Sequence, residues 1–165
     1  PAIVAMAGAP ANLWPIWLQA SDRLGAAVGT ESTDAYLSRA ARTWPAARWA
    51  NQHLPADARV AVLFDWSNQL IARDTLLGSV EDHIPARHWL LTHGNRSIDR
   101  LRDAGVTHLF VGRHRFLRKS YPFVSDADFD ALFESPVSLL DELLLRDATL
   151  IHEEDRTRLY RITPN

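Results

Sequence analysis

The sequence predicts a three-layer α/β domain with a small, mostly parallel sheet and a C-terminal β-hairpin. Two continuous apolar runs, residues 60–64 and 106–111, have the length and composition of strands that are covered on both faces. A helical pattern and a glycine precede the second run, as in the second half of a βαβ crossover. Two further strand-like segments, 150–152 and 158–162, close the chain and predict the hairpin.

The composition fits one ordinary globular domain. The chain has 165 residues, of which 47% are hydrophobic and 23% are charged. The net charge of -2 is too close to zero to predict a nucleic-acid partner. The chain has no cysteine, which excludes disulfides, thiolate metal sites and a cysteine nucleophile. Because the chain opens with Pro1 and shows no signal-peptide pattern, we expect any targeting information to lie outside these residues.

The first 21 residues carry no charge. Their length suits a membrane span of about 20 residues, but two prolines interrupt them. Trp14 and Trp17 are of a residue type that is favoured at membrane–water interfaces. Three interpretations stay open: an arm packed on the domain, a juxtamembrane or interfacial segment, and a true span. The sequence therefore predicts an apolar arm or juxtamembrane segment over 1–30 and a single α/β domain over 31–165.

Helical patterns come before the first strand. Residues 34–42 are predicted as a helix because their apolar side chains recur at helical spacing on one face. Pro45 is placed to open a second helix, which Leu54 and Pro55 end. The strand over 60–64 follows directly.

The middle of the chain supplies the crossover elements. Residues 70–77 fit a short helix and a short strand equally well. Pro85 predicts the start of a helix over 84–91. We predict that Ser97 caps the next helix and that Gly105 ends it as a C′ glycine.

The C-terminal third is predicted as a long helix and the hairpin. Ser125 and Asp128 form a start that resembles a capping box. Leucines at helical spacing continue the helix, which Pro136 restarts. The order of helices and strands therefore predicts a Rossmann-like domain with a right-handed crossover in its parallel part.

A candidate ligand site directly follows the first strand. In open α/β sheets, ligands bind at the carboxyl ends of the strands, and Asp65, Trp66 and Asn68 come at such an end. The side chains of Asp65 and Asn68 can hydrogen-bond a sugar or a nucleotide, and Trp66 can stack on it. The alternative is structural: Asp65 or Ser67 caps a helix, and Trp66 packs in the core.

A basic loop follows the second strand. Arg113, Arg115, Arg118 and Lys119 form the densest cationic cluster in the chain. Such side chains can hold the phosphate of a lipid-linked sugar donor or of a phospholipid head group. The alternative is a solvated loop whose arginines pair with nearby acids.

No motif predicts a metal, a cofactor or a catalytic centre. Asp126, Asp128 and Asp130 are spaced as in a calcium loop, but Ala131 and Val137 replace the required glycine and glutamate. The histidines form no HxH or HExxH pair. Neither a GxSxG, a GxGxxG nor a GxxxxGK[ST] motif is present. The paired carboxylates are adjacent in sequence, so strand or helix geometry separates their side chains.

Four passages carry a resemblance to a known family: 31–39, 50–60, 101–111 and 159–162. In their order they resemble the C-terminal extracytoplasmic domain of polytopic membrane glycosyltransferases, the protein O-mannosyltransferase-like and aminoarabinose-transferase-like enzymes that use polyprenyl-phosphate sugars. The resemblance covers about the last four fifths of the chain. The catalytic acid of this family is expected in an early extracytoplasmic loop, so no catalytic residue is carried over.

The resemblance implies a non-catalytic domain on the extracytoplasmic, periplasmic face of a bacterial inner membrane. There it would lie over the membrane core of the same polypeptide and help to position the acceptor or the lipid-linked donor. Two other functions stay open: a free-standing domain that binds a small molecule or nucleotide, and a module that binds a lipid surface or a protein through residues 113–121.

Overall fold

The computed structural model describes most of the chain and divides it into two compact units. The units are residues 1–42 and 43–165. The described residues are 28–65, 67–77, 84–112, 123–155 and 157–164. No helix among them is both long enough and apolar enough to cross a membrane.

The described part of the first unit contains the helix α2, Thr33–Ala40. The Ser32 hydroxyl accepts a hydrogen bond of 3.1 Å from the Ala35 amide, so this side chain caps the helix. Arg39 forms an ion pair of 3.2 Å with Glu31. These local interactions confirm the helix that the apolar spacing predicted.

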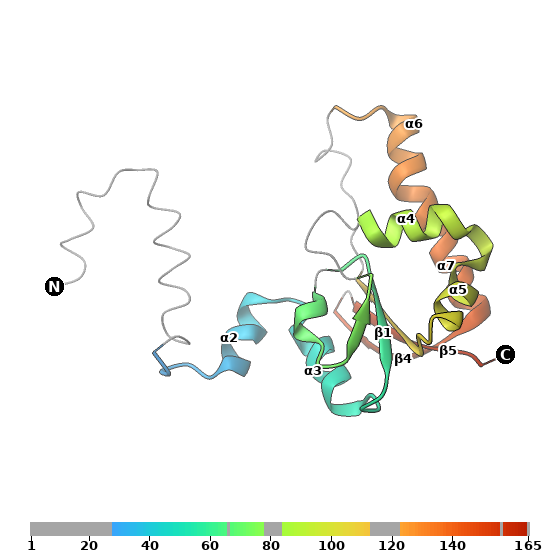
Figure 1. Ribbon diagram of the computed structural model, residues 1–165. Helices are drawn as coiled ribbons and strands as arrows, with labels where there is room; N and C mark the ends of the chain where they lie inside the picture. Colours follow the sequence, from blue (N-terminus) through green and yellow to red (C-terminus); the bar gives the residue numbers. More distant parts are fainter. Residues whose placement is uncertain (1–27, 66, 78–83, 113–122, 156, 165) are drawn as a thin grey trace, which may run out of the picture. The chain divides into compact units, whose positions relative to one another are not determined.

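The second unit is built around a five-stranded mixed sheet with the strand order β2-β1-β3-β5-β4 (Figure 1). β1 pairs in parallel with both β2 and β3, whereas β5 lies antiparallel between β3 and β4. The strands are β1 (Arg59–Leu63), β2 (Asp74–Leu76), β3 (His108–Gly112), β4 (Ala148–Glu154) and β5 (Thr157–Ile162). The parallel part and the C-terminal hairpin are as the sequence predicts.

One face of the sheet is covered by α3, Trp44–His53 (Figure 1). Three alanines of α3 are buried against Val60 and Val62 of β1 and Phe110 of β3. Small side chains let the helix approach the sheet closely, so the bulk of this layer comes from the strands. Pro45 occupies the first turn of α3, where its missing N–H costs no helical hydrogen bond.

The other face is covered by α4, α5 and α7. Leu63 and Leu109 point to this side, where they meet the fully buried Leu90, Leu101 and Leu143 of the three helices. These helices are α4 (Ile84–His93), α5 (Ser97–Asp103) and α7 (Ser135–Asp147). Because residues 60–63 alternate between the two helical layers, both faces of β1 are buried, which confirms the three-layer α/β prediction.

Short helices and turns join these layers. Residues 70–77, for which the sequence fits a helix and a strand equally well, contain the strand β2 and the last residue of a 3₁₀ turn. The short elements are η2 (Ser67–Leu70), η3 (Gly94–Arg96), α6 (Asp126–Phe129) and the π-helix η5 (Asp130–Glu134). The Ser125 hydroxyl accepts from the Asp128 amide at 3.2 Å, which confirms the predicted start of α6.

The start of α5 differs from the prediction, whereas its end agrees with it. Arg96, not Ser97, is the N-cap residue, and the Ser97 hydroxyl instead donates to the Gly94 carbonyl at 2.6 Å. The reason is that η3 leads straight into α5, so Ser97 already has helical dihedrals. At the other end, Gly105 has φ +79° and its amide donates to the Arg102 carbonyl at 2.9 Å. This is the predicted C′ glycine, part of a Schellman turn.

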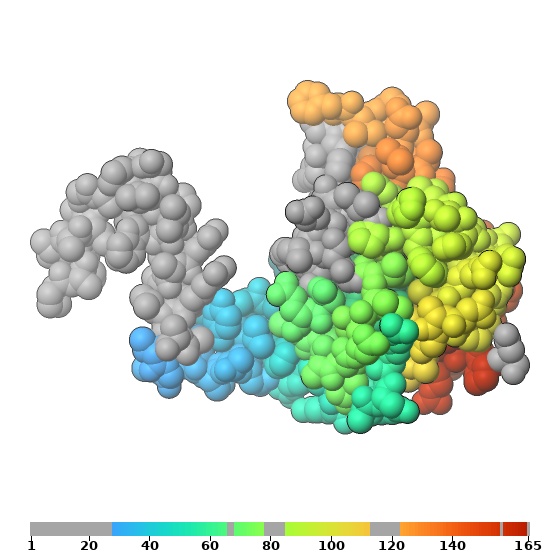
Figure 2. Space-filling view, viewed as in Figure 1, coloured from blue at the N-terminus to red at the C-terminus, as the bar shows by residue number. Residues whose placement is uncertain are grey.

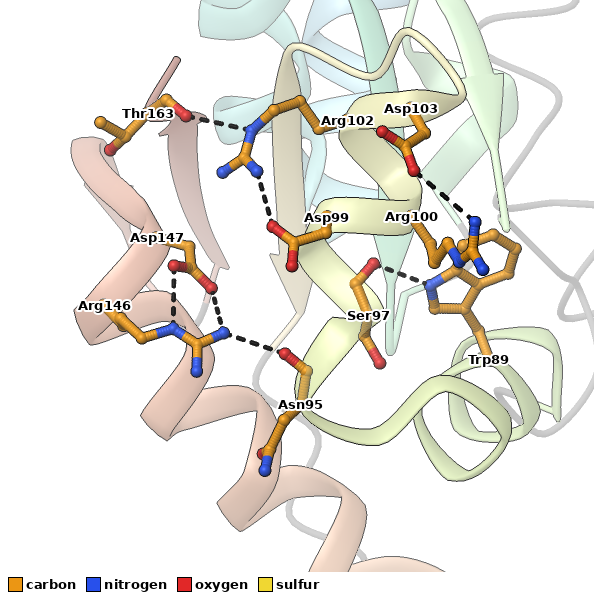
Figure 3. Close-up of polar contacts among 10 residues, drawn as sticks. All are labelled: Trp89, Asn95, Ser97, Asp99, Arg100, Arg102, Asp103, Arg146, Asp147 and Thr163. Atoms are coloured by element: carbon orange, nitrogen blue, oxygen red, sulfur yellow. Dashed lines mark hydrogen bonds and ion pairs between the residues drawn. The ribbon is translucent and has the colours of Figure 1, made fainter. Parts of the chain in front are cut away.

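Polar contacts tie the helices of this second face together (Figure 3). The Trp89 indole N–H donates to the Ser97 carbonyl at 3.1 Å, which joins α4 to α5. Arg146 of α7 donates to the Asn95 carbonyl at 2.9 Å and forms a bidentate ion pair with Asp147. Because main-chain carbonyls accept from the Trp89 and Arg146 side chains, these contacts fix the relative positions of the helices.

Candidate ligand-binding edge of the sheet

The carboxyl ends of the three parallel strands meet at one edge of the sheet. Phe64 and Asp65 follow β1, Leu77 follows β2, and Gly112 is the last residue of β3. Since β1 lies between its two parallel partners, the topology places these residues next to one another. This is the edge at which open α/β sheets bind ligands.

The backbone is strained at two of these strand ends. Phe64 has φ 54° and Leu77 has φ 62°, which is the left-handed region that bulky residues rarely adopt. Each such residue costs about 1–3 kcal/mol and persists only where its surroundings hold it in place. The Phe64 side chain is buried in the core beneath α4 and α7, which supplies that restraint. Strain of this kind gathers at functional sites, so it marks this edge for attention.

Gly112 and Asp65 are in close contact across this edge. A Cβ added to Gly112 would lie 2.6 Å from Oδ2 of Asp65 and 2.5 Å from the carbonyl oxygen of Phe64. Both separations are shorter than any ordinary contact, so only glycine fits at this position. The end of β3 therefore forms a wall against the Asp65 carboxylate, which is only 3% exposed.

Asn68 brings a second oxygen to this edge. It lies in η2, and its Oδ1 atom is buried without a hydrogen-bond partner in the described part of the chain. A buried acceptor without a partner costs about 1–3 kcal/mol. Asn51 of α3 holds η2 in place: its Nδ2 donates to the Leu70 carbonyl at 2.8 Å, and its Oδ1 accepts from the Ala72 amide at 2.7 Å. These bonds hold the end of η2, the turn that carries Asn68.

Two of the residues that the sequence singles out are described: Asp65 follows β1, and Asn68 lies in η2, directly after it. The other candidates lie outside the described residues, so their part in a site stays a prediction; these are Trp66, Arg113, Arg115, Arg118 and Lys119. The chain leaves β3 at Gly112, at the same edge as Asp65.

The sequence does not predict a role at this edge for three of its residues: Phe64, Leu77 and Gly112. The glycine carries a usable signal, because a glycine that closes a buried strand indicates a close backbone approach. The left-handed conformations of Phe64 and Leu77 carry no such signal, since neither residue type favours a positive φ.

Among the residues that the structure describes, no three His, Cys, Asp or Glu side chains lie close enough together to hold a metal ion. Asp126 and Asp128, considered above as part of a calcium loop, lie instead in the first turn of α6, where acids favour the helix dipole.

Comparison with known proteins gives one distant likeness. No protein-family model matches the chain, and no curated protein matches it in sequence. Among solved structures, the chain is similar to the C-terminal globular domain of an oligosaccharyltransferase from Archaeoglobus fulgidus, with 11% sequence identity and a TM-score of 0.47. The likeness covers 81% of this chain and 99% of that one. We carry over no residue role and no activity from it.

Proposed function

We propose that this chain is a non-catalytic domain of a membrane glycosyltransferase-like protein, placed on the extracytoplasmic, periplasmic face of the membrane. In this role it positions the acceptor or the lipid-linked sugar donor over the membrane core of the same polypeptide. The proposal rests on the family resemblance of the sequence and on where the resembling passages lie in the fold.

Three of the four passages that carry the resemblance form the centre of the second unit. Residues 50–60 lead from α3 into β1, residues 101–111 lead from α5 into β3, and residues 159–162 belong to β5. Thr107 joins all three: its amide donates to the Arg59 carbonyl at 2.9 Å, and its carbonyl accepts from the Ile162 amide at 3.0 Å. These two hydrogen bonds are the main support for the proposal, because they join three passages that are separate in the sequence into one contiguous part of the sheet.

The strained edge of the sheet is the part of this framework suited to binding. Sugars present hydroxyl groups, which donate to carboxylate and amide oxygens such as those of Asp65 and Asn68. The end of β3 packs against Asp65, and Asn51 holds the turn that carries Asn68, so both oxygens are positioned before a ligand arrives, which lowers the entropic cost of binding. Such a site orients a substrate without taking part in the chemistry.

The test uses the intact protein that contains these residues. We expect Asn68→Leu to raise KM for the acceptor or the lipid-linked sugar with little change in kcat, because a positioning group contributes to uniform binding. Asn95→Leu serves as the matched control, since Asn95 is exposed and lies in η3, outside the residues of the edge. We also expect no turnover by residues 1–165 alone. Glycosyl transfer by this fragment, or an unchanged KM in Asn68→Leu, would contradict the proposal.

Asn68 Oδ1, which has no hydrogen-bond partner among the described residues, also supports a second candidate function, a free-standing domain that binds a small molecule or a nucleotide. This function predicts that a sugar or nucleotide raises the unfolding free energy by RT ln(1 + [L]/Kd). A thermal-shift screen of the chain separates the two: saturable stabilisation by a soluble nucleotide favours the second function. If only a lipid-linked sugar stabilises the chain, the result favours the first function, a domain of a membrane glycosyltransferase-like protein.

A further inference from the structure

A groove of about 420 Å³ lies at the opposite edge of the sheet, where β3 begins and β5 ends. Its apolar lining comes from Val106, Ile162 and Pro164. In Figure 2 the yellow atoms of α5 and of the turn after it lie against the red atoms of the C-terminal segment, and the groove is formed between these two segments. All its lining residues are described, and none belongs to the edge discussed above.

The charged lining of the groove is entirely of one sign. Arg102 and Arg161 line it together with the neutral His108, and no aspartate or glutamate does. The chain as a whole has a net charge of -2, and Arg102 pairs with Asp99 at 2.7 Å, so the net positive charge of the groove lining comes from Arg161. The exposed Arg161 guanidinium makes no ion pair within the described part of the chain, whereas most other arginines there have an acidic partner or a carbonyl.

Arg102 is held firmly in the wall of the groove. Its Nη1 lies 2.7 Å from Oδ1 of Asp99, and its Nε donates to the Thr163 carbonyl at 3.2 Å (Figure 3). These contacts join α5 to the segment after β5 and keep the groove in shape. Within the described part of the chain, they leave further N–H groups of the guanidinium without a partner.

His108 lies beside Arg161 on the neighbouring strand and is only 5% exposed. Its Nδ1 lies 2.8 Å from Oγ1 of Thr107. Burial lowers the pKa of His108, and the positive charge of Arg161 lowers it further, so the imidazole is neutral at pH 7. Arg102 of α5 also lines the groove, and Arg59 of β1 lies nearby, where it pairs with Asp74 at 2.7 Å.

We propose that this groove binds a small organic anion, a carboxylate or phosphate ester on a short apolar chain. Arg161 holds the oxyanion, Arg102 adds positive charge at the wall, and Val106, Ile162 and Pro164 contact the apolar part. A structural role explains Arg102, which ties the C-terminal segment to α5, whereas Arg161 lines the groove without an ion pair in the described part of the chain. This inference is independent of the proposed glycosyltransferase function.

Binding has a specific electrostatic consequence. An anion next to Arg161 offsets the positive charge that disfavours imidazolium at His108, so binding raises the pKa of His108 and the complex takes up protons. If Arg161 had only a structural role, adding the anion would not change the pKa of His108.

The test follows the His108 ring resonances of the chain by NMR during titration with butyl phosphate, butyrate, inorganic phosphate and butanol. We expect saturable shifts and a raised His108 pKa with at least one butyl anion. We expect weaker binding of inorganic phosphate and none of butanol. Whether butyl phosphate or butyrate binds more tightly identifies the head group.

Variants make the result specific to Arg161. We expect Arg161→Gln to bind about tenfold or more weakly, because it loses a charge-assisted hydrogen bond, and Arg161→Lys to recover part of the affinity. Arg100→Gln is the matched control, since Arg100 lies on α5 outside the groove and pairs with Asp103. Unfolding curves establish that each variant folds. No saturable shift with either anion, equal binding by Arg161→Gln, or equal binding of butanol would overturn the proposal.

Discussion

The indole of Trp49 stacks face to face on the imidazole of His152, with ring centroids 4.3 Å apart and an interplanar angle of 4°. His53 stacks on Trp49 as well, at 4.5 Å and 13°. Trp49 and His53 belong to α3, whereas His152 belongs to the edge strand β4. The stack therefore fastens the edge strand β4 to the helix that precedes β1.

We expect Trp49→Ala to lower the free energy of unfolding by about 2–3 kcal/mol, from lost stacking and lost apolar burial. Trp49→Phe retains an aromatic ring and should lose about half as much. Urea denaturation of both variants and the parent checks this. A Trp49→Ala chain as stable as the parent would show that the stack does not hold β4 in place.

Replacing Gly112 tests the close packing at the candidate edge. Gly112→Ala places a Cβ against the Phe64 carbonyl and the Asp65 carboxylate, and we expect a loss of about 1–3 kcal/mol from overpacking. Gly105→Ala is the comparison, because its Cβ meets nothing closer than 3.9 Å and its cost of about 1 kcal/mol comes from the positive φ alone. Only the Gly112 variant should also weaken ligand binding at the edge. A Gly112→Ala chain with unchanged stability would show that β3 does not press against Asp65.

We expect Asn68 to lower the free energy of unfolding of the chain when no ligand is bound. Because its Oδ1 is buried without a partner in the described residues, Asn68→Leu should stabilise the chain by about 1 kcal/mol while it impairs function. Thermal unfolding, set beside the kinetic measurement proposed above, shows both effects. Marked destabilisation by Asn68→Leu would mean that the amide already has the partners it needs.

The buried His108 predicts a pH dependence of stability. Its pKa in the folded chain is below the ordinary value of 6.5, so between these two values the unfolded chain binds more protons than the folded one. The stabilising effect of a neutral His108 is thus fully present above about pH 6.5 and is lost as the pH falls towards the lowered pKa. We expect His108→Gln to flatten the curve of unfolding free energy against pH below about pH 6.5. An unchanged slope in this variant would place the titrating group elsewhere.

The elements that the sequence predicts well are those with local signals. Pro45, Gly105 and the Ser125 cap each fix a helix boundary through their own backbone chemistry, and both apolar strands lie where the runs predict them. Ser97 failed as a cap because the preceding η3 turn, which has no clear pattern in the sequence, runs directly into α5.

The candidate sites depend on contacts between distant residues, and this limits what a sequence predicts. Asp65 and Asn68 were found because they follow a strand, but the approach of Gly112 to Asp65 arises from the pairing of β1 with β3. The cationic groove joins α5, β3 and β5, whose residues are spread over positions 102–164, so no local pattern reveals it.

The coding sequence around these residues tests the central claim most directly. Sequencing the complete reading frame, and counting its apolar spans, should show several spans of about 20 residues before Pro1, with an acidic residue in the first extracytoplasmic loop. Such a result would support a domain of a membrane glycosyltransferase-like protein. A reading frame without any apolar span would contradict that account and leave ligand binding at the Asp65 and Asn68 edge as the function to pursue.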